Sequence, residues 1–217
     1  MPNRNLINGC ALAGFAALLL VGVVIGLPIL RFTTMSNRHM TVRETIRFSV
    51  PQSLFEIQHS RIGINAIVAE YNRDITFIRE GVIGKTSPLS IDTCGGYPIN
   101  CYLIRDQSRT FIRLDDAVSE HILDLDSETT YIITRYQNKP YYGESTDGRT
   151  SSGWSMSNND SSTLKVTIGD KEAKPMEQLT NGATERYIGQ LTGGMDHLRF
   201  VPASESPERP IRHLFER

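Results

Sequence analysis

The sequence contains little cysteine, a single tryptophan and no excess of charge of either sign. Its 217 residues include 3 Cys and 1 Trp, and 23 Lys and Arg against 24 Asp and Glu leave a formal net charge of −1. Binding to a nucleic-acid backbone depends on blocks of Lys and Arg, and the sequence has none. A structural zinc site needs about four ligands, whereas no C-x-x-C pair is present and the 5 His are scattered. We therefore expect no nucleic-acid partner, no metal and no cofactor.

Motifs that identify enzymes are also missing. The sequence contains no G-x-S-x-G, no P-loop and no G-x-G-x-x-G, and we predict no catalytic residue. One enzymatic alternative stays open, because glycosidases act through two carboxylates and four lie close together in this sequence: Asp115, Asp116, Asp124 and Asp126. A non-enzymatic role is favoured, with a hydrolase that uses a carboxylate pair as the alternative.

One long apolar run lies near the N-terminus, CALAGFAALLLVGVVIGLPIL at residues 10–30. It carries no charge and has the length of about 20 residues that a helix needs to cross the hydrocarbon of a bilayer. A cleaved secretory signal is the rival interpretation, but its apolar region is usually about 7–15 residues long and is followed by an A-x-A-like site, which is absent here. We therefore predict a single uncleaved transmembrane anchor over residues 1–31.

The orientation of this anchor is ambiguous from charge. One arginine precedes the run and several follow it, so the positive-inside rule favours a cytoplasmic location for the bulk of the chain. A short N-terminal tail before one long span is, in contrast, typical of a signal-anchor that exports the remainder. Within the span, Gly22 and Gly26 form a small-xxx-small pair, a pattern that lets two helices approach closely, so a homo-oligomer through this face is possible.

After a short tether over residues 32–41, the pattern changes to the period of two that half-buried strands show. The runs that predict strands are 43–50, 64–71, 75–82, 99–104, 109–115, 129–136, 163–169 and 197–202. Turn signals separate them at 72–74, 84–88, 95–96, 138–140 and 147–148. The pattern predicts a mainly β domain over residues 42–202, an antiparallel sandwich or barrel-like fold.

Helix is the minority in this domain. Residues 174–182 and 184–194 each predict a short helix, the first with Pro175 near its start and Gly182 at its end. Residues 117–125 suit either a strand or a helix. The last residues, 203–217, are charged and rich in proline and predict a polar tail.

Cys94 and Cys101 bracket the stretch CGGYPINC. A redox pair of the thioredoxin type needs C-x-x-C at the start of a helix, whereas here the spacing is longer and a strand follows. Strands joined by a tight Gly-Gly turn can bring two Cα atoms within the roughly 4.4–6.8 Å that a disulfide allows. We predict a disulfide, with two free buried thiols as the alternative. Because disulfides persist in oxidising compartments, the bridge favours an extracytoplasmic domain.

Three aromatic residues are the candidate binding residues. Trp154 lies in a polar loop over residues 146–162, and Tyr141 and Tyr142 precede that loop. Aromatic side chains in loops supply much contact area at a low ordering cost, although Trp154 could equally hold its own loop together.

The sequence as a whole predicts a single-pass membrane protein that presents a β-rich domain outside the cytoplasm. The favoured function is a binding or structural component of an envelope or membrane complex, with a protein partner in the membrane or envelope. Besides the hydrolase, an accessory subunit that packs its helix in a larger membrane complex is an alternative.

Overall fold

The structure is a computed structural model. It describes residues 23–27, 29–30, 43–64, 70–93, 98–106, 108–145, 166–168, 171–193 and 197–210. Most of these residues belong to antiparallel β-sheets, which confirms the predicted mainly β class.

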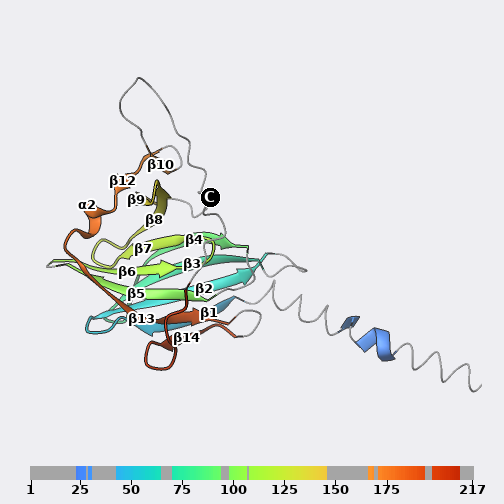
Figure 1. Cartoon of the computed structure of the whole chain (residues 1–217). Coiled ribbons are helices and arrows are strands. Elements are labelled where there is room, and N and C mark those ends of the chain that lie inside the picture. The colour runs from blue at the N-terminus through green and yellow to red at the C-terminus, as the bar shows by residue number, and fades with distance from the viewer. Residues whose placement is uncertain are drawn as a thin grey trace, which may run out of the picture.

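The first sheet, sheet A, has four strands in chain order (Figure 1). They are β1 (Glu44–Ser49), β2 (Phe55–Gly63), β3 (Tyr71–Arg79) and β4 (Val82–Asp92). Glu80 and Gly81 connect β3 to β4 as a two-residue turn in which φ is 51° and 78°. Two successive positive φ angles are typical of a type I′ turn, whose twist matches that of the two strands.

The second sheet, sheet B, has eight strands in the order β12-β9-β8-β7-β6-β5-β13-β14. Strands β5 to β9 follow one another along the chain, and β13 then returns to pair with β5, as Figure 1 shows by the orange strand beside the green one. The strands are β5 (Ile99–Arg105), β6 (Thr110–Asp115), β7 (Glu120–Asp124), β8 (Thr129–Tyr136), β9 (Lys139–Glu144), β12 (Lys174–Pro175), β13 (Thr184–Thr192) and β14 (Arg199–Pro202). A separate pair consists of β10 (Thr167–Ile168) and β11 (Lys171–Glu172).

The two sheets pack against each other through one shared apolar core. Sheet A contributes Phe48, Ile57, Ile75 and Phe77, and sheet B contributes alternate residues of its central strands. The side chains from sheet B are Ile99, Cys101, Leu103, Ile112, Leu114, Leu123, Ile188 and Leu191. Alternation along a strand sends the residues between these to the other face of sheet B, which we call the outer face.

The outer face is also covered, by two segments from the C-terminal third of the chain. The helix α2 (Glu177–Thr180) packs through Leu179 on a second apolar cluster formed with Ile104, Phe111, Ile122 and Ile133. Residues 206–209 lie along β5 and β13 within the segment predicted as a tail, and there the Tyr102 hydroxyl donates to the Glu208 carboxylate over 2.7 Å. Coverage on both faces explains why every β5 residue except its last is buried.

The N-terminal region is described only over residues 23–27 and 29–30, which are helical. Within the described residues, no helix combines the length and the hydrophobicity that crossing a bilayer requires. Most of the predicted anchor, including Gly22, and the tether over residues 32–41 lie outside them.

Several predicted elements were wrong, and β13 is the most instructive. Residues 184–194 predicted a helix, but residues 184–192 form a strand. A bulge between Tyr187 and Gly189 shifts its register, so that Ile188 and Leu191 both join the core although they are three residues apart. This spacing imitates the period of a helix. At Gly189, where φ is 148°, a Cβ atom would collide with the carbonyl oxygen of Val201.

The other corrections concern sheet A and β7. The strand β2 was not predicted, and the turns expected at 72–74 and 84–88 lie inside β3 and β4. Pro88 is tolerated because β4 is an edge strand of its sheet, where a missing N–H need not cost a ladder bond. Residues 120–124 form a strand, which settles the ambiguity over 117–125. The short helix predicted within 174–182 is confirmed as α2.

Candidate functional site

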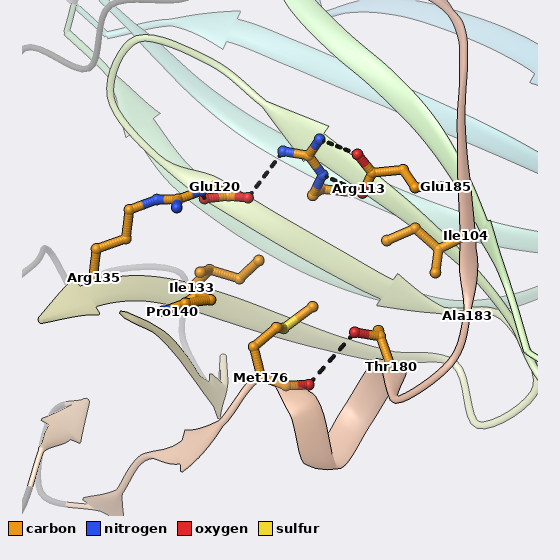
Figure 2. Close-up of a pocket in the computed structure, with 10 residues that line it drawn as sticks. All are labelled: Ile104, Arg113, Glu120, Ile133, Arg135, Pro140, Met176, Thr180, Ala183 and Glu185. Carbon is orange, nitrogen blue, oxygen red and sulfur yellow. Dashed lines mark hydrogen bonds and ion pairs between the residues drawn. The ribbon is translucent and has the colours of Figure 1, made fainter. Parts of the chain in front are cut away.

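A pocket of about 300 Å³ opens on the outer face of sheet B, between its central strands and the segment that carries α2 (Figure 2). We call it the outer-face pocket. Six strands and the α2 segment contribute to it. Its lining consists of Ile104, Arg113, Glu120, Ile133, Arg135, Pro140, Met176, Thr180, Ala183 and Glu185.

Strand register places the charged residues of the pocket. Arg113 of β6 pairs with Ile122, while Asp115 pairs with Glu120 and Arg135 pairs with Pro140. Residues two apart on a strand lie on the same face, so the outward positions of neighbouring strands converge on one side of the sheet.

These charges form one chain of ion pairs along the wall of the pocket. Arg113 donates from Nε and Nη2 to the two oxygens of Glu185, at 3.0 and 2.6 Å. Its Nη1 donates to Glu120 at 3.0 Å, and the other oxygen of Glu120 accepts from Nη2 of Arg135, also at 3.0 Å. Figure 2 shows Arg135 and Glu185 at opposite ends of this chain, with Arg113 and Glu120 between them.

Arg113 contacts an aromatic ring and three carboxylates. Its guanidinium lies 3.9 Å from the centre of the Tyr102 ring, and Nη1 also donates to Asp115 over 3.2 Å. Burial alone would lower the pKa of Arg113, but the hydrogen bonds and charges of Glu185, Glu120 and Asp115 outweigh it and raise that pKa. This arginine therefore stays charged and organises the wall.

The floor of the pocket is apolar. Ile104 and Ile133 belong to the buried cluster beneath α2, and Met176 packs against the same cluster. Among the described residues of the lining, Thr180 alone carries a hydroxyl, which donates to the carbonyl oxygen of Met176 over 3.5 Å. No Ser, Cys, His or Lys occurs among the described residues that line the pocket, and its charged side chains are joined to one another in ion pairs.

Two of the three predicted binding residues, Tyr141 and Tyr142, are described by the structure. Tyr142 pairs with Ile133 and Tyr141 with Thr134, so the two tyrosines face opposite sides of sheet B. Tyr142 makes an edge-to-face contact with Tyr131, with ring centres 5.3 Å apart, close to the outer-face pocket but outside its lining. Trp154 lies outside the described residues. The binding role of these three aromatics stays a prediction.

The predicted disulfide is not seen in the structure. Cys101 is a free thiol, fully buried in the core between the sheets, and its Sγ donates to the carbonyl oxygen of Ile99 over 3.7 Å. Burial raises the pKa of this thiol to about 12, which keeps it protonated and unreactive in the folded protein. Cys94 lies outside the described residues, so the bridge stays a prediction.

The four carboxylates of the hydrolase alternative serve separate structural contacts. Asp115 holds Arg113 on the outer face, whereas Asp116 holds Arg73 between the sheets. Asp124 accepts the backbone N–H of Asp126 over 3.1 Å in the turn after β7. The carboxylate of Asp126 accepts the backbone N–H of Thr110 over 3.1 Å. None of the four lines the outer-face pocket.

A second group of polar residues, which we call the inner polar cluster, is buried between the sheets. Arg73 of β3 forms an ion pair with Asp116 at 2.5 Å and donates to the carbonyl oxygen of Ser90 from Nε and Nη2. Although burial raises the pKa of Asp116, the charge and hydrogen bond of Arg73 lower it below its usual value. The pair links sheet A to the loop between β6 and β7.

Two neutral histidines complete the inner polar cluster. Nε2 of His121 accepts from the backbone N–H of Ser90 at 3.4 Å, which leaves the proton on Nδ1, 3.4 Å from the Ser119 hydroxyl. Burial lowers the pKa of His121 to about 4 despite the charge of Asp116. His59 has no partner for either ring nitrogen among the described residues. Burial, with the charges of Arg73 and Arg61, lowers its pKa to about 3.

Sequence reasoning named none of the charged residues of the outer-face pocket. A signal for two of them was present, because Arg113 and Arg135 interrupt otherwise apolar strands at outward positions of the alternation. Glu185 could not be found, because it was assigned to a helix and its contact with Arg113 joins residues 72 positions apart.

No protein-family model matches the chain, and neither the curated proteins nor the solved structures include a significant match.

Proposed function

We propose that the protein is a membrane-anchored, non-enzymatic binding component, whose β-rich domain lies outside the cytoplasm and offers the outer-face pocket to a partner protein. The apolar run at residues 10–30 supplies the anchor. One observation supports the binding role: the pocket combines an apolar floor with a wall of charged side chains that are ion-paired with one another. Such a site can bury and orient a guest, and the described lining holds no group prepared for chemistry.

The size of the pocket favours one side chain of a protein over a large ligand. Its volume of about 300 Å³ is at the lower end of small-molecule sites. Protein interfaces concentrate their binding energy in a few anchor side chains that fill pockets of this kind. The fixed ion pairs around the rim would give the orientation and the exclusion of water that such an anchor needs.

Site-specific photo-cross-linking in the native membrane tests this function. A photoreactive residue in place of Thr180, at the pocket, should join the full-length protein to one discrete partner, whereas the same residue in place of Glu205, an exposed turn position, should not. Replacing Ala183 by Trp fills the pocket and should abolish the adduct. Equal adducts from both positions, or an adduct that survives Ala183→Trp, would contradict the proposal.

The membrane placement has its own test. The full-length protein should resist extraction by alkaline carbonate, and deletion of residues 1–32 should release it. A mature N-terminus beyond Arg31 would instead establish a cleaved signal. Within the same proposal, Gly22 and Gly26 supply a face for self-association, and a bridge between Cys94 and Cys101 accompanies the extracytoplasmic placement.

A further inference from the structure

The N–H donors that the described contacts leave unused in the wall of the outer-face pocket lie at one end, on Arg135. Arg113 uses Nε and Nη2 on Glu185 and Nη1 on Asp115 and Glu120, and its side chain is 13% exposed. Arg135 donates only from Nη2, to Glu120, among the described residues, and its side chain is 43% exposed. The guanidinium of Arg135 therefore has donors on Nε and Nη1 that face solvent at the rim.

The apolar floor begins beside this arginine. Pro140 lies opposite Arg135 in the β8–β9 hairpin, and Ile133 is two residues earlier on the same face of β8. Met176 lies beside them in Figure 2, and its backbone N–H donates to the carbonyl oxygen of Pro140 over 3.0 Å. A cation with unused N–H donors thus lies at the edge of a small apolar depression. Beside its existing pair with Glu120, those donors are suited to bind an anion.

The other end of the wall limits where an anion can lie. Glu185 is at the far end of the ion-pair chain from Arg135, where it accepts two hydrogen bonds from Arg113 and keeps a side chain that is 41% exposed. A carboxylate at Arg135 would avoid the negative charge of Glu185, whereas a carboxylate at the centre of the wall would lie between Glu120 and Glu185. Planar guanidinium binds carboxylate with particular geometric fit.

Resting on the proposed function, we propose that the outer-face pocket binds an aliphatic group that carries a carboxylate, with the carboxylate on Arg135 and the aliphatic part on Ile133, Pro140 and Met176. The C-terminal residue of a protein chain and a free small carboxylic acid share this chemistry. The volume of about 300 Å³ suits a single residue of the size of leucine.

Binding of N-acetyl-leucine to the full-length protein in lipid nanodiscs tests this proposal. Methyl NMR signals of Met176 and Ile133 report on the pocket, and N-acetyl-leucinamide is the matched probe that lacks the charge. We expect the acid to bind about tenfold more tightly than the amide, because only the acid forms a charge-assisted pair with Arg135. A peptide that ends in leucine should bind more tightly than the acetylated residue if a chain terminus is the source, and equally if a free acid is.

Three variants make the result specific. Arg135→Gln should make acid and amide bind equally, whereas Arg199→Gln, an exposed arginine on β14, should leave the preference intact. Ala183→Trp should abolish binding of both probes. The proposal is overturned if the amide binds as well as the acid, if Arg135→Gln keeps the preference, or if neither probe binds. These outcomes leave the cross-linking result at Thr180 unaffected, so failure of the ligand class is distinguishable from failure of the binding role.

Discussion

The two faces of sheet B use the same kinds of charged residues in opposite ways. On the inner side, Arg73 of sheet A and Asp116 of the loop between β6 and β7 are buried between the sheets, with side chains only 3% and 6% exposed. On the outer face, Arg113 and Glu120 are nearly as well held, but their chain ends in Arg135, which reaches solvent. A closed set of ion pairs fixes how two sheets meet, whereas a set whose end residues, Arg135 and Glu185, are 43% and 41% exposed can receive a guest.

The largest expected difference in stability is between alanine substitutions at two neighbouring residues, Asp116 and Asp115. Asp116→Ala leaves Arg73 buried without its partner and should lower the free energy of unfolding by about 3–5 kcal/mol. Asp115→Ala removes one of the three carboxylates around Arg113 and should cost about 1 kcal/mol or less. Urea unfolding of both variants measures this comparison. Equal losses would show that the two faces do not differ in the way proposed.

A pH dependence is expected from the inner polar cluster. His59 and His121 have folded pKa values of about 3 and about 4, below the value near 6.5 of an unfolded histidine. The unfolded chain therefore binds protons first, so stability is full above about pH 6.5 and falls as the pH drops towards 4. Between pH 7 and pH 5 each histidine should cost roughly 2 kcal/mol.

Unfolding in urea at pH 7, 6 and 5 measures this loss, and the variant His59→Phe is the control. It removes one of the two titrating groups, so the loss of stability between pH 7 and pH 5 should fall by about half. A loss that stays the same in His59→Phe would assign the pH dependence to other groups.

A smaller effect than that of Asp116→Ala is expected at the cysteine on the inner face. A bridge from Cys94 to Cys101 should stabilise the domain by about 2 kcal/mol, because it closes a short loop in the unfolded chain. Since Cys101 is buried, alkylation has to be done after denaturation and without reductant. Protection of both thiols would establish the bridge and with it an oxidising compartment. Free labelling of both would place the domain in the cytoplasm.

The accuracy of sequence reasoning differed between elements for a physical reason. Alternation identified the strands at 44–49, 99–105, 110–115 and 129–136 because apolar side chains recur at every second position in each. It failed at β13, where a bulge gives a helical spacing, and at β2, where polar residues such as His59 and Arg61 are buried between apolar ones. Buried polar residues break the pattern on which such predictions depend.

By itself the sequence determined the mainly β class, the short helix before Gly182 and the apolar run at residues 10–30, because these depend on local spacing, turn residues and length. Only the tertiary structure decided which charges meet. The return of β13 to β5 brings Glu185 to Arg113, and the packing of sheet A on sheet B brings Arg73 to Asp116. Ion pairs across strands far apart in sequence depend on register and sheet order, which no local pattern encodes.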